Sequence, residues 1–203
     1  MISPDDQTAR ANIRDCALAL FADHGFDVVT IREIAACAGV SPALVLHHYG
    51  SKEGLREAVD AHVAGAFDAM LMQAPDAWDM ANPEASVGLG EMMLRSLPQG
   101  TPIPSYLRRL LLSGDPAGRQ LFRRWLDMTI ALDERLIAAG MMRPTDDPEA
   151  RAAFLMVNDL AMVLLRPHLI DAIKLDPLTA DGMRRWAANA IDAYANGVFT
   201  TQK

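Results

Sequence analysis

Apolar residues recur along this chain at the three- and four-residue spacing of helices buried on one face. Ile13, Ala17, Leu20 and Phe21 form the first such stripe, and Gly25 follows where the helix should end. Alanine, leucine and methionine dominate the apolar residues and β-branched runs are few, so we expect an all-α fold. The longer helices are expected at about 6–24, 51–73, 84–97, 103–113, 117–140, 148–172 and 178–197, with a loop at 74–85.

Residues 30–55 interrupt this pattern twice within a short stretch. Thr30 and Glu33 have the spacing of a capping box, which predicts a helix that starts at residue 31 and stops at Gly39. Ser41 then caps a second helix with Pro42 in its first position, and that helix ends near Gly50. Helix, tight turn and helix is the arrangement that presents a second helix to the major groove of DNA, although helical hairpins also occur in proteins that bind no DNA.

A helical wheel of residues 41–49 divides this second helix into two faces. Pro42, Val45, Leu46 and Tyr49 are expected to face the core, whereas Ala43, Leu44, His47 and His48 are expected to face outward. Alanine and leucine could contact thymine methyl groups, and the histidines could bind base edges or phosphates. The alternative is that Leu44 packs against another helix and the two histidines have no role in binding.

Phosphate contacts are expected at the starts of the neighbouring helices. Free N–H groups and the helix dipole favour an anion near Thr30 and Lys52, and Arg32 could add a charge-assisted contact. The predicted DNA-binding residues are therefore Thr30, Arg32, Ser41, Pro42, Ala43, Leu44, His47, His48, Tyr49 and Lys52. An acidic balance opposes nonspecific binding, because residues 1–60 contain five Lys or Arg and nine Asp or Glu, and the whole chain has a net charge of −7.

The stretch "TIREIAACAGVSPALVLHHYGSKEGL", preceded by "ALALFADHGFDVVT", resembles the TetR family of bacterial transcriptional regulators. The resemblance implies an N-terminal three-helix helix-turn-helix domain, residues 1–52, joined to a larger helical domain, residues 53–203, that dimerises and binds a small effector. It also implies a regulator, most often a repressor, that binds a palindromic operator as a homodimer and is released by its effector. Family members often have an aromatic residue at the position of Leu46 and a small polar one at that of Leu44, so this chain departs from the pattern at both.

The last two expected helices are the most apolar long segments, and their stripes suggest a surface for a partner. In the resembling family this pair forms a four-helix dimer interface. The predicted interface residues are Met156, Leu160, Val163, Leu164, Met183, Ala187, Ala190, Ile191 and Tyr194. The alternative is that these helices complete the core of a monomer.

The middle of the chain is where an effector cavity is expected. Methionine adapts to irregular shapes, so a lipophilic small molecule could lie against Met70, Met92, Met93, Trp125 and Met128. The alternative, that these side chains are ordinary core, is the commoner use of such a stripe.

The remaining features exclude other classes of protein. We find no nucleophile elbow, phosphate-binding glycine loop, metal-ligand spacing or acid–base carboxylate pair, so no enzyme, cofactor or metal is expected. No signal peptide or membrane span is expected either, so the protein should be cytoplasmic, and Cys16 and Cys37 should be two buried thiols. A redox switch would require the two cysteines to be close and exposed. The alternative function is a helical ligand-binding or protein-interaction module that no longer reads DNA.

Overall fold

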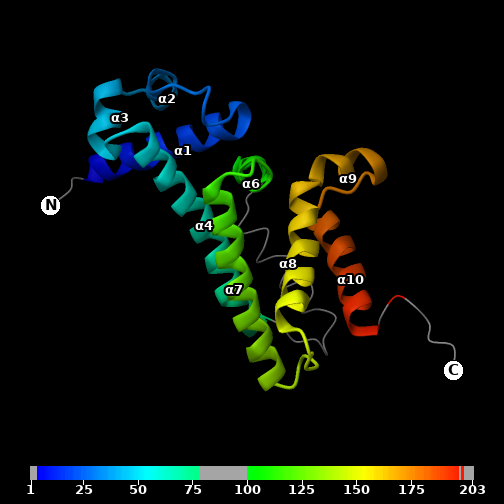
Figure 1. The fold of residues 1–203 in the computed structure, drawn as a ribbon. Coiled ribbons are helices and arrows are strands. Elements are labelled where there is room, and N and C mark those ends of the chain that lie inside the picture. The colour runs from blue at the N-terminus through cyan, green and yellow to red at the C-terminus, as the bar shows by residue number, and fades with distance from the viewer. Residues whose placement is uncertain (1–3, 78–99, 197, 199–203) are drawn as a thin grey trace, which may run out of the picture. The chain divides into compact units, whose positions relative to one another are not determined.

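The computed structural model describes residues 4–77, 100–196 and 198, and these residues form helices joined by turns without a strand. Helices α1 (Pro4–His24), α2 (Ile31–Ala38), α3 (Pro42–Tyr49), the first half of α4 (Lys52–Ala77), α6 (Ile103–Leu112) and the start of α7 (Pro116–Ala138) form one compact unit. The rest of α4 and α7 belongs to a second unit with α8 (Pro148–Leu164), α9 (Arg166–Ile173) and α10 (Ala180–Asn196) (Figure 1). The expected all-α fold is confirmed.

The core of the first unit forms where α1 meets α2, α3 and α6. Ile13 and Phe21 of the predicted stripe on α1 are buried, as are Ile34 of α2 and Val45 of α3. Val45 has no exposed surface, so it packs the short α3 against the helices beneath it. This packing matters because an eight-residue helix has little stability of its own in water.

The turns around α2 and α3 follow the predicted capping chemistry. Thr30 and Glu33 form both halves of a capping box, and Gly39 ends α2 with φ at +68°, in the left-handed region that favours glycine. Ser41 caps α3, with its Oγ accepting a hydrogen bond from the Leu44 N–H at 3.2 Å. Ser51 accepts a bond from the Gly54 N–H at 3.0 Å at the start of α4. The predictions for the Thr30–Glu33 box, Gly39 and Ser41 are confirmed.

Three polar contacts hold α6 and the start of α7 to the rest of the first unit. Arg109 on α6 donates through Nε to the Ala22 carbonyl at 2.7 Å and through Nη2 to the next carbonyl, at the C-terminal end of α1. Arg56 on α4 donates to Asp115 at 2.5 Å, and the Tyr106 hydroxyl donates to Asp60 at 2.6 Å. The first unit therefore contains more of the chain than the predicted domain 1–52, whose boundary falls at the first residue of α4.

In the second unit, α8 and α10 lie side by side (Figure 1), and the Asn158 side chain donates to the Tyr194 hydroxyl at 2.7 Å. Met162, Val163 and Met183 form a buried cluster, and Leu169 and Trp186 pack against it. These contacts join α8, α9 and α10 into one packed group.

Three sequence predictions about helix boundaries need correction or lie outside the described residues. The expected helix 148–172 is two helices that meet at Leu165 with a bend of 68°. The cause is Pro167, which has no N–H to donate and whose ring clashes with the carbonyl four residues earlier. Residues 74–77, expected in a loop, extend α4 instead, and the expected helix 84–97 lies outside the described residues. In the described part, no single helix is long and apolar enough to span a membrane, although α8 and α9 together meet that test of length and composition.

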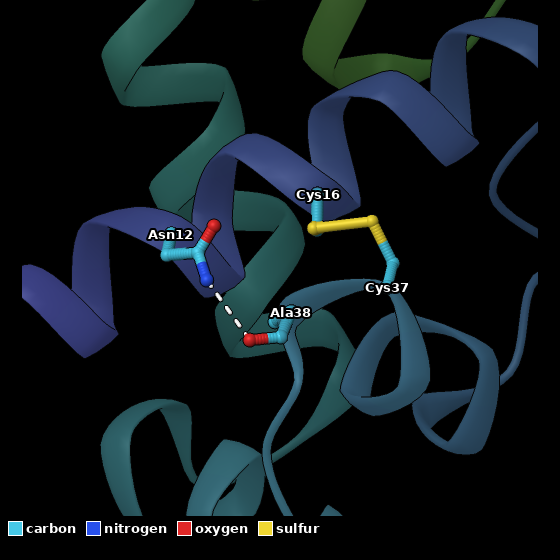
Figure 2. Close-up of a disulfide and its surroundings, with 4 residues drawn as sticks. All are labelled: Asn12, Cys16, Cys37 and Ala38. Carbon is cyan, nitrogen blue, oxygen red and sulfur yellow. Dashed lines mark hydrogen bonds between the residues drawn. A yellow bond between two sulfur atoms is a disulfide. The ribbon is translucent and has the colours of Figure 1, made fainter.

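The prediction of two buried thiols is wrong. Cys16 on α1 and Cys37 on α2 form a disulfide, and Cys37 is exposed (Figure 2). The two residues are 21 positions apart, so only the packing of α2 on α1 brings them together.

Candidate nucleic-acid interface

The exposed face of α3 consists of Pro42, Ala43, Leu46 and His47. Leu46 is 44% exposed and Pro42 is exposed as well, so the predicted place of these two residues on the core face is wrong. These residues follow the i, i+3, i+4 spacing of one helical face, and none of them is acidic. The face is therefore uncharged and partly apolar, apart from one imidazole.

The opposite face of α3 packs on α1, which corrects the expected positions of the other residues. The His48 side chain is only 5% exposed and its Nε2 lies 3.5 Å from an Asp6 carboxylate oxygen, so His48 does not share the outward face with His47. The Tyr49 hydroxyl donates to the Arg10 carbonyl at 2.6 Å, and burial raises the pKa of Tyr49 above its usual value. Leu44 is half-buried rather than outward. The physical reason is the contact with α1, because the side of α3 that meets it carries residues 44, 45, 48 and 49.

The start of α2 presents backbone N–H groups and one free cation to solvent. Thr30 and Arg32 are both exposed. Thr30 donates from its backbone N–H to Glu33 Oε2 at 2.7 Å and from its hydroxyl at 2.8 Å, and these bonds hold the pKa of Glu33 below its usual value. The Glu33 carboxylate is thereby directed at its own capping box. Because the Glu33 N–H donates to Thr30 Oγ1, the N–H groups left for an anion are those of Ile31 and Arg32.

Lys52 at the start of α4 is held by the loop between α1 and α2. Its Nζ lies 4.3 Å from the centre of the Phe26 ring and 3.4 Å from the Asp27 carbonyl oxygen. The guanidinium of Arg56 lies over the same ring at 4.7 Å. These contacts hold the ammonium group of the half-buried Lys52 next to the loop.

The predicted effector residues can be placed only in part. Trp125 is 2% exposed and Met128 is half-buried, both on α7. Met70 lies on α4, but its side chain is outside the described residues, as are Met92 and Met93. Of the five predicted residues, the structure therefore places only the side chains of Trp125 and Met128. Among the residues described, no group of side chains that could hold a metal ion occurs.

The predicted dimer residues divide into two groups. Met156, Leu160, Val163 and Met183 are buried within their own protomer, so they belong to its core. The remaining ones are half-buried: Leu164, Ala187, Ala190, Ile191 and Tyr194. The exposed apolar stripe on α8 is instead formed by Phe154 at 66% and Val157 at 48%, and Leu165 at 49% follows it at the bend.

Two features of the first unit could not be predicted from the sequence. The first is the exposed position of Leu46, because a helical wheel gives the spacing of residues but not the direction of the core. The second is Arg109, whose side chain the structure shows bound to the Ala22 and Asp23 carbonyls near the end of α1. A basic residue 86 positions away gives no local signal for such a contact.

Comparison with known proteins identifies relatives for both parts of the chain. Residues 13–59 match the family model described as bacterial regulatory proteins, tetR family, and residues 99–200 match the tetracyclin repressor-like C-terminal domain. The chain is 37% identical to the HTH-type transcriptional regulatory protein RaaS of Mycobacterium tuberculosis over 75% of this chain and 68% of that protein. It is 30% identical to the HTH-type transcriptional repressor AcnR of Corynebacterium glutamicum over 69% of this chain and 71% of that protein. Among solved structures, the regulator FadR of Bacillus subtilis in complex with stearoyl-CoA superimposes with a TM-score of 0.71 at 13% identity, covering 93% of this chain and 99% of FadR.

Proposed function

The chain belongs to the TetR family of bacterial transcriptional regulators, and we propose that it is a ligand-responsive repressor that binds a palindromic operator as a homodimer. The observation that carries the proposal is the exposed, acid-free face of a capped α3 in a helix-turn-helix of the right length. RaaS and AcnR are named as regulators, and we infer a regulator rather than an enzyme, acting in the cytoplasm where the DNA lies.

The reading face is assigned to α3. Ala43 and Leu46 contact thymine methyl groups, and His47 binds a base edge. Ser41 and Pro42 place the start of α3 at the groove, while the partly buried Leu44, His48 and Tyr49 support the helix from behind.

The phosphate contacts are assigned to two helix starts. Thr30 and Arg32 approach one phosphate at α2, and Lys52 approaches another at α4. These contacts set the position of the protein on the duplex, whereas the α3 face selects the sequence.

Dimerisation is assigned to the outer stripe of α8, formed by Phe154, Val157 and Leu165, together with the half-buried face of α10. A second copy of the chain is the occupant, because large exposed apolar side chains within three helical turns are costly in a monomer. A two-fold axis at this surface would present two α3 helices to two half-sites of a palindrome.

The effector is proposed to be a lipophilic small molecule bound in the second unit, near Trp125 and Met128. Support comes from their apolar chemistry and from the stearoyl-CoA in the FadR structure, a protein with a similar fold. The effector releases DNA by binding more tightly to a dimer whose reading helices have the wrong separation. Arg109 links this signal to DNA reading, because it joins α6 to the end of α1 within the first unit.

Random-sequence duplex selection with the purified full chain tests the proposal. We expect a palindromic winner bound by a dimer. His47→Ala should weaken that sequence by about 1–3 kcal/mol and random DNA less, whereas Lys52→Ala should weaken all sequences alike and reduce the salt slope by about one. His168→Ala and Arg185→Ala, which change an exposed histidine and an exposed cation in the second unit, are the matched controls. If a folded dimer enriches no sequence, the chain is a ligand-binding or protein-interaction module instead.

A further inference from the structure

The disulfide between α1 and α2 lies within the unit that contains the reading helix. Cys16 and Cys37 are the two cysteines of the chain, and their Cα atoms are 5.9 Å apart (Figure 2). This separation is close to the commonest value for disulfides, so the backbone needs no rearrangement to form the bond.

A hydrogen bond next to the disulfide keeps the two helices aligned without the sulfur atoms. Asn12, one turn before Cys16 on the same face of α1, donates from Nδ2 to the Ala38 carbonyl at 2.9 Å (Figure 2). Ile13 and Ile34 are fully buried in the same helix pair. The two thiols of the reduced protein therefore stay near each other, which favours reversible closure.

The two cysteine residues differ in their exposure to solvent. Cys37 is exposed in the last turn of α2, whereas Cys16 is half-buried on α1. A reagent from solution can reach Cys37 first, and Cys16 is placed to react second. This asymmetry is that of an attacking and a resolving thiol.

We propose that Cys16 and Cys37 form a reversible oxidation site for low-molecular-weight disulfides, and that its closure locks the helix-turn-helix onto α1. The Cys37 thiolate attacks one sulfur of the reagent, whose S–S bond breaks and releases one thiol. The Cys16 thiolate then attacks Cys37 Sγ, the mixed S–S bond breaks, and the second thiol leaves. Two cysteine thiols are oxidised and one small disulfide is reduced to two thiols.

The lock acts on α3 through a very short connection. Cys37 lies in the last turn of α2, and residues 39–41 separate that helix from α3. Tying α2 to α1 therefore restricts the opening of α2 and α3 together. Slower opening is expected to extend the lifetime of bound DNA in the oxidised protein, a consequence that rests on the proposed function.

The chemistry is tested with the full chain, first reduced and then exposed to glutathione disulfide. Thiols are counted by intact mass after alkylation in denaturant. We expect complete loss of two thiols within one monomer and their return with dithiothreitol. Two free thiols after oxidation, or a disulfide between chains, would overturn the proposal.

Serine variants test the order of attack. Cys16→Ser lacks the resolving thiol, so it should accumulate a glutathione adduct on Cys37. Cys37→Ser should accumulate at least about tenfold less adduct, because Cys16 is shielded. Equal adduct on both variants would contradict the assigned roles.

Amide hydrogen exchange tests the lock. Amides of α2 and α3 should exchange at least about tenfold more slowly in oxidised than in reduced protein, with no such difference in Cys16→Ser. Equal exchange in both forms of the wild-type protein would refute the lock. Thiol counting and exchange need no DNA, so they decide this proposal even if no operator is found.

Discussion

Replacing Asp115 with asparagine should destabilise the protein by removing one half of an ion pair in the first unit. Arg56 donates to Asp115 Oδ2 at 2.5 Å, and Oδ1 accepts from the Ala117 N–H at 2.8 Å. The Arg56 and Asp115 side chains are 21% and 26% exposed, between a surface pair and a buried one. Exposed pairs contribute up to about 1 kcal/mol, whereas breaking a buried pair costs about 3–5 kcal/mol. We therefore expect a coupling energy of about 1–2 kcal/mol.

A double-mutant cycle isolates this coupling. Arg56→Met should cost more than Asp115→Asn, because Arg56 also lies over Phe26 and 3.8 Å from Asp60. The double variant should be less destabilised than the sum of the single changes by the coupling energy. Urea unfolding should be followed by circular dichroism, since residues 1–66 and 101–122 contain no tryptophan to report on them. A coupling below about 0.5 kcal/mol would show that solvent screens the pair as it screens surface pairs.

The same pair predicts a pH dependence with a definite sign. The hydrogen bond from Arg56, followed by that from Ala117, holds the pKa of Asp115 below its usual value. A lowered folded-state pKa adds stability above the unfolded-state pKa, and that stability is lost as pH falls through the folded-state pKa. The difference between wild type and Asp115→Asn should therefore be constant from about pH 5.5 to 8 and shrink below about pH 4. A difference that persists undiminished in acid would refute the electrostatic explanation.

Other substitutions test packing and a second ion pair. Gly54→Ala should cost more than about 2 kcal/mol in urea unfolding, because its Cβ would lie 2.3 Å from the Tyr49 carbonyl oxygen. Gly65→Ala on the same helix meets open space and should stabilise by about 0.5–1 kcal/mol, so a loss there would contradict this reasoning. Arg166→Met should cost about 1 kcal/mol near neutral pH and less below about pH 4, because the two bonds from Arg166 hold the pKa of Asp176 below its usual value. Arg166→Lys should recover only part of that loss, since lysine lacks the planar fork, and full recovery would show that charge alone matters.

Local sequence rules predicted the turns of the first unit well. The Thr30–Glu33 box, the left-handed Gly39 and the Ser41 cap depend on atoms within four residues, so spacing alone specifies them. The same rules explain the break between α8 and α9, because Pro167 acts on its own turn. The sequence pattern nevertheless predicts a single helix over 148–172, because apolar residues continue at helical spacing on both sides of the break.

Features that depend on distant parts of the chain could not be predicted in this way. The direction of the α3 face is set by α1, which reaches Tyr49 through the Arg10 carbonyl and thereby turns Leu46 outward. The disulfide likewise depends on how α2 packs on α1, and two cysteines 21 residues apart have no diagnostic spacing. The buried residues of α8 and α10 could not be predicted for the same reason. An apolar stripe on a helix does not reveal whether it packs within its own protomer or against a partner.

The acidic balance of residues 1–60 does not describe the surface proposed to face DNA. Helix α3 contains no acidic residue, the Glu33 carboxylate is bound by Thr30, and the Asp6 carboxylate lies 3.5 Å from His48, which is not on the exposed face of α3. In the proposed complex, Arg32 and Lys52 would supply about two phosphate contacts per protomer, which predicts a salt slope of about −3 to −4 for a dimer. Such a modest slope implies that little of the affinity is nonspecific attraction. Selection of the operator must then come from the shape and apolar contacts of the α3 face, and changes at that face should alter sequence preference far more than salt dependence.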